Sequence, residues 1–172
     1  MTGGELAAEL EREHPDAFAW ALRCCEGVRD DAEEALHTAY ERILDGRARF
    51  EGRSSFRTWL FGVVRRTALE QRRRGWLRLL RLRLWFLRES PPLAAAPDPG
   101  SALVEQERVE RLRLALGHLS KRQRELMHLV FYQDLSVQEA ARVLHIPVGT
   151  ARTHYQRGKA RLRALLAGED PA

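Results

Sequence analysis

Apolar residues recur every three or four positions along most of this chain, and the pattern is clearest between residues 120 and 166. That period is typical of amphipathic α-helices. Ser120–Gln123 and Ser136–Glu139 each place an amide or carboxyl group three residues after a serine, which is the capping box that begins a helix. Pro147 follows a short turn and suits the first turn of a third helix, where its missing N–H would be unpaired anyway. The pattern predicts a helix-turn-helix.

The third helix of this motif, from about residue 148, has one apolar face and one polar face. Small and apolar residues mark the inner face at helical spacing, namely Ala151, Tyr155, Gly158 and Leu162. Arginine can bind guanine with two hydrogen bonds and glutamine can do the same for adenine, so the outer face suits the major groove of duplex DNA. An isolated basic helix would more often be a solvated face, but the two capping boxes and the short turn favour DNA binding. The candidate residues are Thr150, Arg152, Thr153, His154, Gln156 and Arg157.

The first 46 residues are strongly acidic, with twelve acidic residues against four arginines. We expect Pro15 to open one helix and a second helix to run from about Asp30 to Asp45. The polar residues of this second helix lie off its apolar stripe and include Glu33, Glu34, His37 and Glu41. Such a face is either solvated or docks another protein. A metal site at Glu33 and His37 is disfavoured because no second histidine or partner motif accompanies them.

Residues 47–88 reverse this balance, with thirteen arginines against two acidic residues. A helix is expected from about Phe56 to Arg74, with Trp59 and Leu60 on its inner stripe. Arginines interleaved with an exposed aromatic residue suit a single nucleic-acid strand, because bases stack on rings while guanidinium groups follow the phosphates. The alternative is a solvated arginine face with a half-buried Phe61. The candidate residues are Phe50, Arg53, Arg57, Phe61, Arg65 and Arg66.

Composition narrows the function classes. The 172 residues carry a net charge of +5, and charge segregation of this kind suggests separate surfaces for protein and for nucleic acid. Neither a membrane-spanning run nor a signal-peptide pattern is present, so a cytoplasmic location is expected. The adjacent Cys24 and Cys25 suit neither a disulfide nor a zinc site, and we expect them to be part-buried helix residues. The sequence lacks a phosphate-binding glycine loop, a nucleophile with a base, and a metal cluster, which predicts no enzyme activity, cofactor or small-molecule substrate.

Three strings together resemble one family. Asp31-Ala32-Glu33-Glu34, the run from Phe50 to Leu60 that contains Ser-Phe-Arg-Thr-Trp-Leu, and Ile146-Pro147-Val148-Gly149-Thr150 are similar to the bacterial RNA polymerase sigma factors of the extracytoplasmic-function (ECF) group. The resemblance covers nearly the whole chain apart from the middle. It implies an all-α protein of two small helical domains, joined by a Pro/Ala-rich linker, with a helix-turn-helix in the second.

The resemblance also implies a function without catalysis. Such a factor binds core RNA polymerase and directs it to promoters; the acidic face (Glu33, Glu34, His37, Glu41) would dock on the clamp of the largest subunit. The loop and arginine-rich helix would hold the single-stranded −10 element, and the last helix would read the −35 element. An anti-sigma protein is an expected partner. His145 stands where the family often has glycine, at a position that often needs a left-handed backbone.

The resemblance places the N-terminal domain at residues 1–75, a basic apolar segment and linker at 76–100, and the C-terminal domain at 101–172. Residues 76–88 could pack between domains, bind an inhibitory partner or lie on a membrane surface. A polymerase-independent helix-turn-helix regulator is the alternative function, but it would leave the acidic helix without a role.

Overall fold

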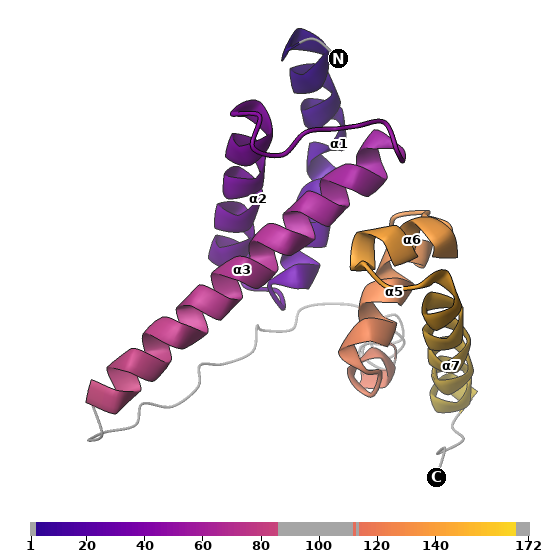
Figure 1. Ribbon diagram of the computed structural model, residues 1–172. Coiled ribbons are helices and arrows are strands. Elements are labelled where there is room, and N and C mark those ends of the chain that lie inside the picture. Colours follow the sequence, from indigo (N-terminus) through magenta and orange to yellow (C-terminus); the bar gives the residue numbers. More distant parts are fainter. Residues whose placement is uncertain (1–2, 86–111, 113, 168–172) are drawn as a thin grey trace, which may run out of the picture.

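The computed structural model describes residues 3–85, 112 and 114–167, and this part of the chain is helical and contains no β-strand. This agrees with the all-α fold that the sequence predicts. Two groups of helices lie side by side, joined through the undescribed middle of the chain (Figure 1). The N-terminal bundle comprises α1 (Gly3–Cys24), α2 (Arg29–Leu44) and α3 (Phe56–Trp85), and the C-terminal unit comprises α5 (Lys121–Phe131), α6 (Val137–Leu144) and α7 (Val148–Ala167).

The N-terminal bundle has a core of small residues from α2 and large residues from α1 and α3. Trp20 is fully buried, and its indole Nε1 donates a hydrogen bond to the backbone oxygen of Phe61 at 3.0 Å, so the polar atom of this side chain is satisfied. The alanines of α2 are fully buried and let α1 and α3 approach it closely. The fully buried members include Ala17, Ala21, Ala32, Ala35, Ala39, Leu60, Val64 and Ala68.

The expectation that Pro15 opens a helix is wrong, because Pro15 lies inside α1, which begins at Gly3. A proline within a helix removes one backbone hydrogen bond. Pro15 is exposed, so water has access to this part of the helix, while Leu10 and Ala17 on either side of it are buried in the same core. Packing of the apolar face therefore maintains the helix across the proline.

The C-terminal unit is the predicted helix-turn-helix. Ser120 accepts a hydrogen bond from the backbone N–H of Gln123, and Ser136 accepts one from that of Glu139, so both capping boxes are present. His145 adopts a left-handed conformation with φ 53° and ψ 48° at the end of α6. At Gly158, a Cβ atom would lie 3.4 Å from the side chains of Gln123 and Met127, at van der Waals contact, so α5 and α7 pack closely at this position.

The two groups of helices contact each other directly. Arg65 on α3 and Glu125 on α5 form a buried ion pair, with 3.3 Å between Nη2 and Oε2. The rings of Trp20 and His128 stack with centroids 5.5 Å apart. Close to this stack, Arg57 donates a hydrogen bond to the Gln133 side chain at 2.9 Å. These contacts bring the second unit against α1 and α3.

Some expectations concern residues outside this description. The Pro/Ala-rich linker from Ser90 to Gly100 and the helix expected from about Ser101 lie outside the described residues. The helix expected to end near Arg74 continues to Trp85, so the first part of the basic apolar segment (residues 76–88) is helical. No helix in the described ranges is long and apolar enough to cross a membrane.

Candidate nucleic-acid and polymerase interfaces

The polar face of α7 is exposed at the side of the molecule where this helix begins. Arg152 and Arg157 are exposed and form no ion pair within the described part of the chain. His154 is half-buried, whereas the other polar candidates of this face are exposed; these are Thr150, Thr153 and Gln156. Ala151 is fully buried beneath them. The structure therefore places all six predicted residues in the first three turns of one helix, with free guanidinium groups available for base edges or phosphates.

The acidic face of α2 is also exposed. Glu33, Glu34, His37 and Glu41 are all exposed, as the sequence predicts. Glu33 is paired with Arg29 at 2.8 Å, and His37 Nδ1 lies 3.7 Å from Glu41 Oε1. Glu34 forms no ion pair among the described residues, so its charge is the one on this face most available to a partner. No cluster of three or more metal-ligating side chains is present in the described ranges.

The predicted single-strand residues of the basic segment are divided between two environments. Arg53 and Arg66 are exposed. Phe50 is half-buried and contacts Phe56 and Trp59, with ring centroids 5.5 and 5.4 Å apart. These three candidates lie around the loop and the solvent side of α3. They remain accessible while the two groups of helices are in contact.

The remaining three candidates are engaged within the protein. Phe61 is fully buried and stacks against Trp20, so the expectation of an exposed aromatic residue at this position is wrong. The expectation that Arg65 faces outward is also wrong, because this residue is 5% exposed and pairs with Glu125. Arg57 is half-buried and lies 2.8 Å from Asp16. The cause is the same in each case: α1 and the C-terminal unit cover this side of α3.

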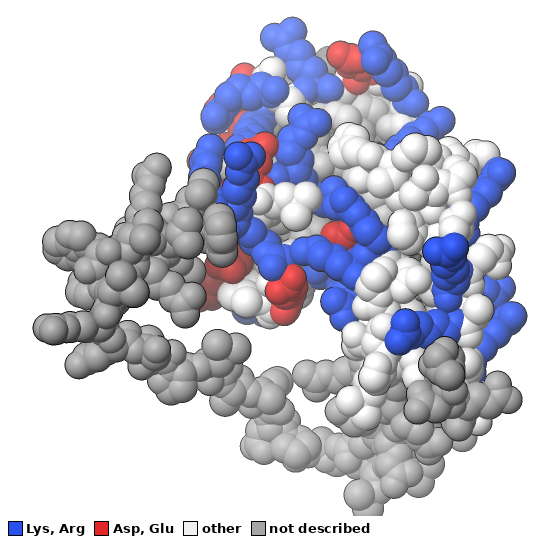
Figure 2. Space-filling view, turned by 60° about the horizontal axis from the view of Figure 1, so that its bottom comes forward, with Lys and Arg blue, Asp and Glu red and all other residues white. Residues whose placement is uncertain are grey.

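Electrostatics at the junction are dominated by arginine. Figure 2 shows one face of the molecule, on which lysine and arginine side chains cover more surface than aspartate and glutamate. Burial, together with the neighbouring Arg66 and Arg65, lowers the pKa of His145. Burial and the nearby Arg23 lower the pKa of His128 to about 4, so this ring is neutral at pH 7. Protonation of either histidine would add positive charge where positive charge is already concentrated.

Sequence reasoning missed the acidic partner of this junction. Glu125 is buried on α5, next to the apolar residues Leu126 and Leu129. A carboxylate adjoining the apolar stripe of a helix needs a partner, and that is the signal in the sequence that could have identified it. Its partner, Arg65, is 60 residues away along the chain. A pair so distant in sequence cannot be assigned from local periodicity.

An exposed polar helix in a helix-turn-helix, beside the arginine-rich loop and α3 of the N-terminal bundle, defines a two-part helical DNA-binding protein. The family model for sigma-70 region 2 matches residues 10–78, and that for sigma-70 region 4 matches residues 109–162. The ECF RNA polymerase sigma factor SigX of Bacillus subtilis is 30% identical over 140 residues, which are 78% of this chain and 70% of that protein. SigE of Mycolicibacterium smegmatis is 27% identical over 162 residues, which are 92% of this chain and 61% of that protein.

The chain belongs to the ECF RNA polymerase sigma factors, and it is a promoter-specificity factor. Solved structures share its fold. The sigma factor RpoE of Bartonella quintana, crystallised with the anti-sigma factor NepR, superposes with a TM-score of 0.67 at 24% identity, over 95% of this chain and 97% of that one. CnrH in complex with the cytosolic domain of CnrY superposes with a TM-score of 0.56 at 24% identity, over 98% and 89%.

Proposed function

We propose that this chain binds core RNA polymerase through the acidic face of α2 and contacts promoter DNA through α7 and the loop before α3. The observation that carries the proposal is the exposed polar face of α7, whose arginines have no acidic partner among the described residues. In this assignment α7 reads the −35 element, and Phe50, Arg53 and Arg66 contact the single-stranded −10 element. The proposed domains are residues 1–75 and 101–172.

Arg57, Phe61 and Arg65 contact other parts of the protein, so they can reach the −10 strand only after the helices move apart. The C-terminal unit covers Arg65 and binds Arg57 in the arrangement described here. We place their contribution in the polymerase-bound state, where the two groups of helices must separate to reach two promoter elements. Phe61 would also have to leave the core, so we expect it to contribute least to −10 binding.

A titration with core RNA polymerase in the absence of DNA tests the polymerase-binding part. We expect saturable one-to-one binding that is weakened by Glu34→Arg, because the substitution reverses the unpaired charge of the α2 face. Glu11→Arg, which reverses an exposed carboxylate on α1, is the matched control and should bind as the unmodified protein does. Absence of binding by the folded, unmodified protein would instead support the polymerase-independent regulator, which nothing in the structure favours.

Promoter binding by the holoenzyme tests the assignment of α7. A bidentate arginine–guanine contact discriminates by about 1–3 kcal/mol, so Arg152→Ala should weaken −35 recognition by about 5- to 150-fold while polymerase binding is unchanged. Arg163→Ala removes an exposed arginine near the other end of the same helix and should have little effect. Equal losses in the two variants would show that α7 contributes only general positive charge.

The proposed partners are core RNA polymerase, promoter DNA and an anti-sigma protein. Two of the structural neighbours are sigma factors bound to NepR and to CnrY, which supports the third partner. We propose a cytoplasmic location, where the polymerase is present. The contribution of the protein is binding free energy, which places the polymerase and opens the strands, rather than catalysis.

A further inference from the structure

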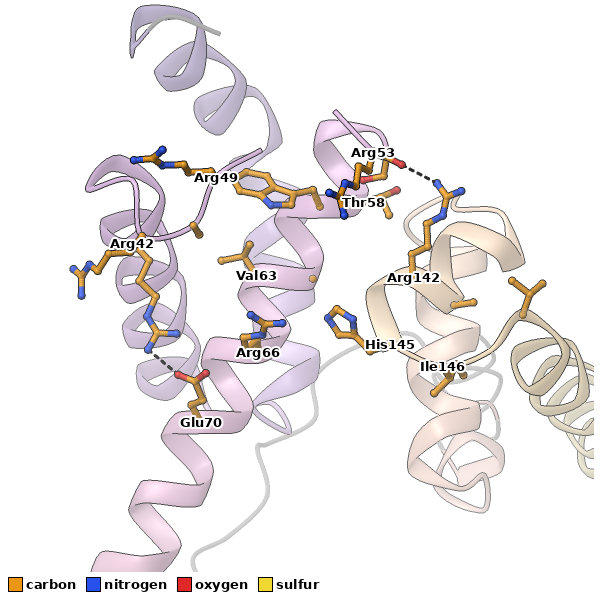
Figure 3. Close-up of a pocket in the computed structure, with 17 residues that line it drawn as sticks. Arg42, Arg49, Arg53, Thr58, Val63, Arg66, Glu70, Arg142, His145 and Ile146 are labelled. Carbon is orange, nitrogen blue, oxygen red and sulfur yellow. Dashed lines mark hydrogen bonds and ion pairs between the residues drawn. The ribbon is translucent and has the colours of Figure 1, made fainter. Parts of the chain in front are cut away.

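A basic cleft lies between the N-terminal bundle and the C-terminal unit. It has a volume of about 930 Å³, and its walls come from the end of α2, the loop that follows, the first half of α3, and α6 with the turn after it. Figure 3 shows Arg66 of the N-terminal bundle and His145 of the C-terminal unit opposite each other across this space. Six arginines line it, and Glu70 is the one carboxylate among its lining residues; the arginines are Arg42, Arg47, Arg49, Arg53, Arg66 and Arg142.

Half of these arginines are not neutralised. Arg42 pairs with Glu70 at 2.7 Å, Arg53 with Glu51 at 3.0 Å, and Arg47 with Asp45. The other three, Arg49, Arg66 and Arg142, form no ion pair within the described part of the chain. Arg49 donates to the backbone oxygen of Gly46, and Arg142 donates to that of Arg53 across the cleft (Figure 3). Both retain further guanidinium donors.

The positive charges come from both groups of helices, Arg142 from the C-terminal unit and the other five arginines from the N-terminal bundle. Arg66 on α3 lies opposite His145, and its charge is among the causes that lower the pKa of that histidine. Closure of the two units brings Arg142 of the C-terminal unit into the same cleft as the arginines of the N-terminal bundle, where their charges repel, in contrast to the opposite charges of Arg65 and Glu125 in the buried interface. A bound anion would remove the repulsion. The cleft has the volume of a small-ligand site rather than of a groove for duplex DNA.

We propose that this cleft binds a polyphosphate anion, with phosphate groups held by Arg49 and Arg66 from the N-terminal bundle and by Arg142 from the C-terminal unit. The guanidinium group matches phosphate oxygens in a two-pronged geometry, which is why three unpaired arginines favour phosphate over a single carboxylate. The site goes beyond promoter recognition, because it exists only when the two units are in contact. A ligand that binds this arrangement alone stabilises it by mass action.

Two sources share this chemistry, an inorganic polyphosphate and the phosphate chain of a nucleotide. Trp59 also lines the cleft and is half-buried, so a base could stack on its ring. The two sources differ in a measurable way. A nucleoside triphosphate that binds more tightly than inorganic tripolyphosphate identifies the nucleotide, and equal affinities identify the phosphate chain alone. Both results support the site.

Isothermal titration of the full chain with sodium tripolyphosphate, at constant ionic strength and without polymerase, tests the proposal. We expect saturable one-to-one binding. Arg49→Gln and Arg142→Gln should each weaken it by about tenfold, the effect of losing one charge-assisted interaction. Arg161→Gln removes an equal charge from an exposed position on α7 outside the cleft and should leave the affinity unchanged.

Three results would overturn the proposal. Absence of saturable binding removes the site, and an equal loss in Arg161→Gln reduces it to general attraction by a basic protein. An effect of Arg49→Gln without one of Arg142→Gln would show that the ligand does not bridge the two units. Arg49 and Arg142 belong to none of the proposed polymerase or promoter contacts, so the proposed function and this site succeed or fail separately.

Discussion

The buried ion pair between Arg65 and Glu125 should determine how firmly the two groups of helices associate. Their side chains are 6% and 3% exposed, and the pair joins α3 to α5. Arg122 also contacts the same oxygen of Glu125, at 3.1 Å, but it is 43% exposed and remains hydrated. Substitution of Glu125 by alanine would leave Arg65 as an uncompensated charge in the interface, where the Nε atom already has no hydrogen-bond partner among the described residues.

Removal of one member of a buried ion pair typically costs about 3–5 kcal/mol. In this protein the cost can be relieved without unfolding, because separation of the two units exposes Arg65 to water while the cores of both remain intact. A loss of about 3 kcal/mol from the association would change the ratio of closed to open molecules by about a hundredfold. We therefore expect Glu125→Ala to open the molecule, with little change in its helix content.

Small-angle X-ray scattering of the full chain measures this opening as an increase in the radius of gyration. Glu11→Ala, which removes an exposed carboxylate of α1, is the control for the change in net charge. Replacement of the pair by Arg65→Met with Glu125→Leu should restore the compact form, because an apolar pair does not carry the desolvation cost of two charges. Equal radii of gyration for Glu125→Ala and Glu11→Ala would refute the reasoning.

Two other predictions concern histidines. The pKa of His128 is lowered to about 4 in the folded protein and is near 6.5 in the unfolded chain. As the pH falls from 6.5 toward 4, the unfolded chain therefore binds a proton at this residue that the folded protein does not, and the free energy of unfolding decreases. Denaturant unfolding should show that His128 lowers the free energy of unfolding by at most about 3 kcal/mol between pH 7 and pH 4. His128→Phe should make the free energy of unfolding depend less on pH. His145→Gly should raise the free energy of unfolding by about 1 kcal/mol, because glycine adopts the left-handed conformation without strain; a lower melting temperature would contradict this.

The helix-turn-helix could be predicted from the sequence because its determinants are local. Each capping box needs a serine and a residue three positions later, and both were formed as expected at Ser120 and Ser136. The left-handed conformation of His145 agrees with the family resemblance, in which glycine often stands at this position. Such features depend on backbone geometry within one turn of helix, and distant parts of the chain seldom override them.

The far side of α3 could not be predicted in this way. Helical periodicity identifies one apolar stripe and assigns the remaining face to solvent. In α3 that other face meets a second partner, because Arg65 contacts α5 and Phe61 packs on Trp20. Trp20 is 41 residues from Phe61 along the chain, and Glu125 is 60 residues from Arg65. Arg65 is therefore buried on the second packing face of α3, where its partner Glu125 is also charged.

Contact between the two units leaves two of the proposed functional surfaces exposed and covers part of the third. The α2 face with Glu34 and the α7 face with Arg152 are exposed while the units are in contact, whereas Arg65 is covered and Arg57 is bound to Gln133. Polymerase docking and −35 contacts therefore need no opening at these residues, but full contact with the −10 strand does. The interface therefore opposes contact of Arg57 and Arg65 with the −10 strand, so a weakened interface should favour the step in which the single strand is captured.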